Sequence, residues 1–165
     1  MENVIKKNIK KNKIKIINQF KDKYFFLSNF YPCNIIYKDE IYPSSEHLYQ
    51  ALKTKNKDHR CMIKNARTCG EAKRLGSRVT LREDWEEVKI EKMYKVLTLK
   101  FSQNPDLAKK LLKTKDTYLI EGNYWHDNFW GICICLTCKT IKPKIYKDGN
   151  QLGQLLMHLR TELYK

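Results

Sequence analysis

The sequence has few of the residues that interrupt helices and strands, with six glycines and four prolines among 165 residues. It has no apolar run near the ~20 residues that cross a bilayer. Its basic, asparagine-rich start lacks the apolar stretch of a signal peptide. Aromatic residues make up 12% of the chain, whereas disordered segments are depleted in them. We therefore expect a folded, soluble, cytoplasmic protein with its own core and no membrane contact.

Negative charge is also scarce. The 33 Lys and Arg outnumber 18 acidic residues, and the formal net charge is +15. This balance favours polyanionic partners such as nucleic acid, nucleotides or phosphorylated metabolites. Scattered lysines also serve solubility, so the charge does not choose among these partners.

Six cysteines are present, and we expect them to be reduced thiols. Cys133, Cys135 and Cys138 form a local cluster. A tetrahedral zinc site needs four ligands, so His126 or a distant cysteine would have to complete it. We expect instead that a pair of these thiols lies on a buried hairpin strand, that the cluster is not needed for catalysis, and that the protein binds no metal and no cofactor.

Hydrophobic periodicity predicts an α+β, helix-rich compact single domain with a few short strands. Residues 1–13 are expected to form a basic flexible leader, and residues 14–165 the domain. Strands are predicted over residues 14–20, 34–37, 40–42 and 117–121, the middle two forming a hairpin. Helices are predicted over residues 57–66, 71–75 (closed by Gly76), 84–104 and 150–164, with another beginning at Pro105.

A further helix, beginning after Pro43, carries the most informative pattern. At ~3.6 residues per turn, Glu46 and Lys53 lie on one face with Tyr49 and Gln50 between them. A serine just ahead can cap this helix, which places Glu46 in the first turn. Such a face is either an ordinary solvated surface or part of a site.

Two loops strengthen the second interpretation. Residues 26–30 place Ser28 and Asn29 between aromatic side chains, and residues 123–130 gather aromatic residues around Asp127. Aromatic walls beside an acid suit a flat, polar ligand, although each feature alone also fits core packing or a turn. Arg78 and Arg82, in another loop, fit phosphate binding or a solvated surface.

Taken together, the motifs resemble the NADAR family, also called YbiA-like, from about residue 16 to residue 160. The resemblance is carried by Phe26-Leu27-Ser28-Asn29-Phe30, Ser45-Glu46-His47-Leu48-Tyr49-Gln50-Ala51-Leu52-Lys53, Ala72-Lys73-Arg74-Leu75-Gly76, Trp85-Glu86-Glu87-Val88-Lys89, Met93, Lys100-Phe101, Trp130-Gly131 and Asn150-Gln151-Leu152-Gly153-Gln154-Leu155-Leu156-Met157.

This resemblance implies a small α+β YbiA-like domain and an intracellular N-glycosidase without a metal. Some family members act on phosphoribosylamino-pyrimidine intermediates of riboflavin synthesis, and others remove ADP-ribose from guanine in nucleic acid. The family's leading catalytic glutamate falls on Glu46. Its acid ahead of Trp-Gly falls on Asp127, and an acid further upstream falls on Glu121.

The chain departs from the family pattern in two places. Members often carry an acid shortly after Trp-Gly, where this chain has Ile132, and residues 133–148 replace a short glycine-rich turn. If that acid has a catalytic role in the family, the role is either absent from this chain or performed by Asp127. Because the longer segment lies near the expected pocket, it bears on the substrate range.

The residue chemistry fits this reaction. Breaking a ribosyl C–N bond builds positive charge on the sugar, which a carboxylate beside C1 stabilises. Glu46 can do this or deprotonate the attacking water, and Asp127 can take the other task. Lys53 or Asn29 can assist the leaving base, or Lys53 can form a Schiff base with the opened sugar. The predicted substrate-binding residues are Asn29, Phe30, Tyr49, Trp85, Trp130, Arg78, Arg82 and Glu121.

We therefore expect an N-glycosidase whose substrate is a small phosphorylated ribosyl compound. One alternative is removal of ADP-ribose from guanine in nucleic acid, which the charge of +15 favours. Another is a noncatalytic module that binds nucleic acid or ADP-ribose. Release of free base separates the two enzymes from the binding module.

Overall fold

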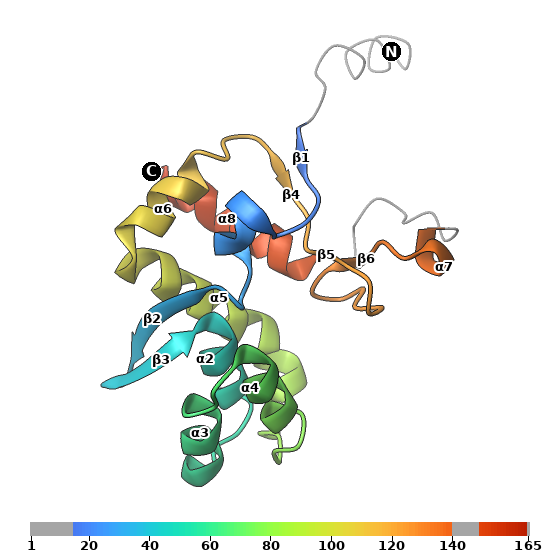
Figure 1. Ribbon diagram of the computed structural model, residues 1–165. Helices are drawn as coiled ribbons and strands as arrows, with labels where there is room; N and C mark the ends of the chain where they lie inside the picture. Colours follow the sequence, from blue (N-terminus) through green and yellow to red (C-terminus); the bar gives the residue numbers. More distant parts are fainter. Residues whose placement is uncertain (1–14, 140–148, 165) are drawn as a thin grey trace, which may run out of the picture.

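The computed structural model describes residues 15–139 and 149–164, and the predicted leader at residues 1–13 lies outside them. Within these two ranges helices dominate, and the strands form three separate two-stranded sheets (Figure 1). The predicted helix-rich α+β architecture is confirmed. None of the described helices is both long and apolar enough to span a bilayer.

The predicted hairpin is present. β2 (Pro32–Tyr37) pairs antiparallel with β3 (Glu40–Ser44). Lys38 and Asp39 connect the strands with φ values of 51° and 62°, as a tight two-residue hairpin turn requires.

The other strands pair in parallel and are very short. β1 (Ile16–Ile17) pairs with β4 (Tyr118–Leu119), and β5 (Gly122–Asn123) pairs with β6 (Ile132–Cys133). The strand predicted over residues 14–20 is therefore too long. Its alternating pattern is real, but β4 offers only a two-residue partner, and the chain soon enters a 3₁₀-helix, η1 (Asp22–Leu27).

The helices lie close to their predicted positions, except for α7, which was not predicted. They are α2 (Ser45–Ala51), α3 (Lys57–Lys64), α4 (Cys69–Gly76), α5 (Trp85–Gln103), α6 (Pro105–Leu112), α7 (Leu136–Lys139) and α8 (Gln151–Leu163). Side-chain oxygens of Ser44, Asn56 and Thr68 cap α2, α3 and α4. Glu46 lies in the first turn of α2, as predicted.

α2 lies in the interior of the molecule (Figure 1). It contacts the β2–β3 hairpin, α3, α4 and α5, while α5 also contacts α8 on its other side. Every residue of α2 is buried, including Glu46 and Gln50. Burying a carboxylate and an amide is costly unless they are paired. The polar face predicted from spacing is therefore an internal polar cluster and not a solvated surface.

Gly76 ends α4, as predicted, but without the left-handed backbone that glycine often adopts after a helix. No glycine in the described part of the chain has a positive φ, and Gly76 is itself helical. It needs to be small because α4 packs closely against α2 at this point.

Candidate active site

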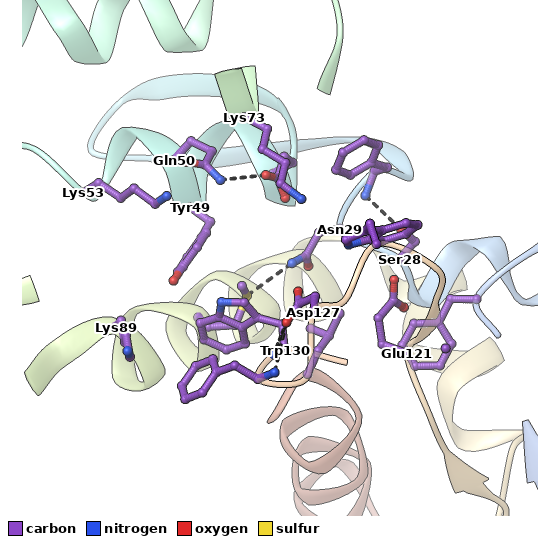
Figure 2. A pocket seen from close by; sticks show the side chains of 18 of the residues that line it. Ser28, Asn29, Tyr49, Gln50, Lys53, Lys73, Lys89, Glu121, Asp127 and Trp130 are labelled. Atoms are coloured by element: carbon purple, nitrogen blue, oxygen red, sulfur yellow. Dashed lines mark hydrogen bonds between the residues drawn. The ribbon is translucent and has the colours of Figure 1, made fainter. Parts of the chain in front are cut away.

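A cavity of about 470 Å³ opens between α2, α5, the loop of residues 26–30 and the β5–β6 connection. Figure 2 shows Tyr49 and Gln50 projecting from α2 and Lys53 from the turn that follows it, with Asp127 and Trp130 coming from the β5–β6 connection. Nine predicted site residues line it: Asn29, Phe30, Glu46, Tyr49, Lys53, Trp85, Glu121, Asp127 and Trp130. Segments far apart in sequence thus meet around one space.

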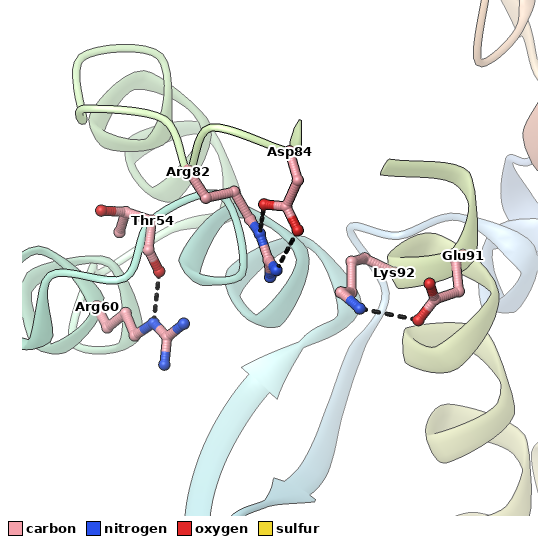
Figure 3. Close-up of polar contacts among 6 residues, drawn as sticks. All are labelled: Thr54, Arg60, Arg82, Asp84, Glu91 and Lys92. Carbon is pink, nitrogen blue, oxygen red and sulfur yellow. Dashed lines mark hydrogen bonds and ion pairs between the residues drawn. The ribbon is translucent and has the colours of Figure 1, made fainter. Parts of the chain in front are cut away.

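The structure does not bring Arg78 and Arg82 to this cavity. Arg82 lines a smaller hollow of about 340 Å³ beside residues 54–56. Its guanidinium makes a two-pronged contact with Asp84, at 2.5 and 2.7 Å (Figure 3). Arg78 is exposed just beyond α4. Both arginines were expected to bind phosphate beside the pocket, but neither lines it. Arg82 is instead paired with Asp84 at the start of α5.

Glu46 is the carboxylate at the back of the cavity and only 6% exposed. Its Oε1 accepts a hydrogen bond of 2.7 Å from Gln50 Nε2. Burial raises the pKa of Glu46, while the Gln50 bond and the charges of Lys73 and Lys53 oppose that rise. Burial likewise lowers the pKa of Lys53, against the pull of Glu46. The carboxylate of Glu46 in α2 and the amine of Lys53 just after that helix are therefore electrostatically linked.

Glu121 faces the same cavity from just before β5. Burial, with the nearby charge of Asp127, raises its pKa to about 7. Its backbone N–H donates to Asn150 Oδ1 at 3.0 Å, and a Cβ on Gly131 would lie 2.2 Å from its carbonyl oxygen. The glycine of Trp-Gly therefore permits a close backbone approach that positions Glu121. A carboxyl that titrates near neutral pH can donate or accept a proton.

Asp127 is held in a tight turn at the cavity wall. Its Oδ1 accepts hydrogen bonds from the backbone N–H groups of Phe129 and Trp130, at 3.0 and 2.9 Å. Asn123 Nδ2 donates to its carbonyl oxygen at 2.6 Å. The sequence left a turn and a ligand pocket as alternative interpretations of Asp127. In the structure, Asp127 both closes a turn and lines the cavity.

Aromatic rings form one wall. The ring of Tyr49 lies 5.3 Å from that of Trp85 and 5.4 Å from that of Trp130, between centroids. Phe129 packs edge-on against Trp130 at 5.0 Å. Such rings offer faces on which a planar base can stack.

Sequence reasoning missed most of the basic residues at this cavity. Lys21, Lys73 and Lys89 line it together with Lys53. Lys73 Nζ lies 5.8 Å from the ring centroid of Trp125, and Lys89 Nζ lies 4.4 Å from that of Phe129. Lys73 lies in the Ala72–Gly76 motif and Lys89 ends the Trp85–Lys89 motif of the family resemblance. Membership in these motifs was therefore the sequence signal that could have identified them as cavity residues.

Buried contacts fix the loop of residues 26–30. Lys100 is fully buried, and its Nζ donates to the carbonyl oxygen of Ser28 at 2.8 Å. Asn29 Nδ2 contacts Met93 Sδ at 3.4 Å. Asn29 Oδ1 and Glu121 Oε2 are buried acceptors with no hydrogen-bond partner within the described residues. Unpaired buried acceptors favour a ligand that brings donors, such as sugar hydroxyls or amino groups.

The cysteine cluster lies beside the cavity, although not on a hairpin strand. Cys133 ends β6, which is parallel to β5, whereas Cys135 and Cys138 come after that strand. The predicted hairpin placement is therefore wrong, because a hairpin joins antiparallel strands, whereas β6 runs parallel to its partner β5. His126 lies within reach of all three thiols.

Sequence comparisons place these features in a family. The family model of the NADAR domain matches residues 16–164. N-glycosidase YbiA of Escherichia coli (strain K12) is 34% identical over 148 residues, covering 86% of this chain and 83% of that protein. N-glycosidase Npun_R5314 of Nostoc punctiforme is 37% identical over 145 residues, covering 85% and 86%.

A longer relative and a solved structure agree with this family match. Riboflavin biosynthesis protein VVA0006 of Vibrio vulnificus is 36% identical over 146 residues, but the chain spans only 35% of its length. The NMR structure of Escherichia coli YbiA superposes with a TM-score of 0.74 at 32% identity, covering 91% of this chain and 85% of that one. With its motifs gathered around one cavity and the family match running through nearly its whole length, the chain belongs to the NADAR domain family.

Proposed function

We propose that the cavity is the active site of an N-glycosidase that hydrolyses the ribosyl C–N bond of a phosphorylated ribosyl compound. The observation that carries the proposal is the buried Glu46 carboxylate, which Gln50 holds and Lys53 and Lys73 flank. Relatives of similar length are named N-glycosidases, which supports the reaction class.

In the proposed reaction, water adds across the C–N bond. The bond from C1 to nitrogen breaks, positive charge builds on the ribose, and Glu46 stabilises that charge. Water attacks C1 and gives a proton to Asp127, while the leaving nitrogen takes a proton from Glu121. The products are a ribose phosphate and a free base.

The three carboxyl groups suit these separate tasks. Glu121 has a pKa of about 7, so a substantial fraction holds a proton near neutral pH and can donate it. Backbone hydrogen bonds orient the Asp127 carboxylate. Lys53 remains the alternative proton donor or Schiff-base nucleophile, and its lowered pKa favours either use. Borohydride trapping of a substrate-derived adduct on Lys53 would identify the Schiff-base route.

Binding is proposed to use two kinds of group. The rings of Tyr49, Trp85 and Trp130 stack on the base, and lysines around the cavity pair with the phosphate. The first substrates to test are ribosylamino-pyrimidine phosphates, because one relative is named a riboflavin biosynthesis protein.

The test is a substrate panel. The full chain is incubated with ribosylamino-pyrimidine phosphates and, separately, with ADP-ribosylated guanine in oligonucleotides, and free base is measured by mass spectrometry. Glu46→Gln serves as the inactive control. Release of the pyrimidine by the parent, and not by Glu46→Gln, supports the proposal. If the parent releases no free base from any of the substrates, the proposal is contradicted.

Removal of ADP-ribose from guanine in nucleic acid is the second candidate. The formal charge of +15 and the lysines at the cavity favour it. Release from the oligonucleotide with steep salt dependence, and none from free pyrimidine compounds, would select this candidate. Salt-sensitive DNA binding without any product would point to a noncatalytic module.

A further inference from the structure

Four metal-binding side chains meet beside the cavity. The Nδ1 atom of His126 lies 3.3 Å from Cys138 Sγ, 3.6 Å from Cys133 Sγ and 3.7 Å from Cys135 Sγ. All four donor atoms lie within 4.8 Å of one another. From this geometry we propose that His126, Cys133, Cys135 and Cys138 bind one Zn²⁺ ion in a structural site.

The distances match a single tetrahedral ion. Zinc binds thiolate at about 2.3 Å and imidazole nitrogen at about 2.0 to 2.1 Å. At a tetrahedral angle, these lengths place nitrogen and sulfur about 3.5 Å apart. The three distances from His126 Nδ1 fall around that value. An iron–sulfur cluster would hold its ligands farther apart, because several irons and sulfides lie between them.

The ligand set also selects zinc. Three thiolates and one imidazole are soft to borderline donors that disfavour magnesium and calcium. Cys135 and Cys138 have the two-residue separation common in zinc sites. The backbone N–H of Cys138 donates to Cys135 Sγ at 3.4 Å, so the two cysteines lie close together. With four protein ligands the ion has no open position, so its role is structural.

The expectation of no metal was based on the three thiols being one ligand short, although His126 or a distant cysteine was named as the residue that could complete the set. His126, seven positions before Cys133, supplies the fourth ligand through a backbone with φ 64°. Histidine is among the residues found more often in this left-handed region. The three thiols lose their protons on binding, so affinity should fall at low pH.

The site ties the cavity wall to a neighbouring segment. His126 lies between Trp125 and Asp127, both of which line the cavity, whereas the thiols follow from β6 into α7 (Figure 1). An ion bound here would hold the β5–β6 connection against that segment. The metal content can be measured whether or not the cavity is an N-glycosidase site, so the two proposals can fail separately.

The first test is elemental analysis of the full chain, purified under reducing conditions without chelator. We expect about one zinc per chain. Cys138→Ser and His126→Asn should each weaken zinc binding by at least about 10-fold. Asparagine tolerates the left-handed backbone, so His126→Asn mainly removes the ligand. Cys61→Ser, an exposed thiol on α3, should keep the full zinc content.

Cobalt keeps the proposal testable even if a variant fails to fold. Apoprotein of the parent sequence is titrated with Co²⁺, and we expect the strong visible bands of tetrahedral cobalt with sulfur-to-metal charge transfer, displaced by zinc. Weak octahedral bands, a different stoichiometric metal, a disulfide in place of metal, or unchanged zinc in Cys138→Ser would each overturn the assignment.

Discussion

Gly76 and Gln50 are in direct contact where α4 crosses α2. A Cβ on Gly76 would lie 2.1 Å from Gln50 Oε1 and 2.8 Å from Gln50 Cβ. The opposite end of the same amide donates to Glu46 Oε1 at 2.7 Å. The glycine therefore provides the space in which Gln50 fixes the buried carboxylate.

Gly76→Ala should disturb both the packing and the site. Because the Cβ of Gln50 belongs to the rigid part of its side chain, α4 must shift as well, and we expect a loss of about 1 to 3 kcal/mol in the free energy of unfolding. Turnover should fall together with stability, since Gln50 moves away from Glu46. Chemical denaturation and a turnover assay measure the two effects.

Gly70→Ala is the matched control on the same helix. A Cβ there would meet only Thr68 Oγ1, at 3.9 Å. Replacing an unconstrained helical glycine should stabilise the protein by about 0.5 to 1 kcal/mol. Equal losses in both variants would mean that the contact with Gln50 is not the cause.

The sequence predicted which residues share a face of α2, but not how deep that face lies. Spacing alone placed Glu46, Gln50 and Lys53 together. Burial depends on α4 and α5 packing over α2, which local pattern does not encode. For the same reason Gly76 was assigned to a helix end, where glycine is common, and not to a close helix contact.

Glu46→Gln tests catalysis without changing shape. We expect turnover to fall by at least about 100-fold, the scale of a positioned acid or base. The melting temperature should stay nearly unchanged, since burial already disfavours the charged form of Glu46. Glu87→Gln, on an exposed part of α5, should leave turnover alone. Normal activity in Glu46→Gln would end the catalytic assignment.

The basic and sulfur-containing groups mark a second limit of sequence reasoning. Arginines were favoured for phosphate because of their forked geometry, yet lysines from α4, from α5 and from the turn after α2 reach the cavity. Similarly, the three thiols were visible in sequence, whereas the proximity of His126 requires the turn that Asp127 closes. The first depends on how the helices pack and the second on loop geometry, and residue spacing determines neither.

Lys73→Gln should weaken substrate binding. Its side chain lines the cavity but is exposed, so we expect a loss of about 1 kcal/mol, roughly a fivefold rise in KM. Added salt should raise KM more in the parent than in the variant. Arg78→Gln removes an exposed positive charge away from the cavity and should leave KM unchanged. A rise in KM for Arg78→Gln alone would place the phosphate site elsewhere.

Glu121 should make stability depend on pH in a defined direction. Burial and the charge of Asp127, with a smaller contribution from Glu46, raise its pKa from 4.5 to about 7, against the opposing charges of Lys100 and Lys73. The folded state therefore holds this proton more tightly than the unfolded chain. The free energy of unfolding should fall as pH rises from about 4.5 to about 7, by at most about 3 kcal/mol from this group.

Glu121→Gln removes that titration. The difference in unfolding free energy, variant minus parent, should therefore grow between pH 5 and pH 8, by at most about 3 kcal/mol. Denaturation at several pH values measures it, with Glu87→Gln as an exposed control whose difference from the parent should stay flat. Groups that do not interact with Glu121 titrate equally in parent and variant, so their contributions cancel in this comparison. A constant difference for Glu121→Gln would mean that Glu121 is already ionised at pH 5, and it could then not supply the proton to the leaving nitrogen.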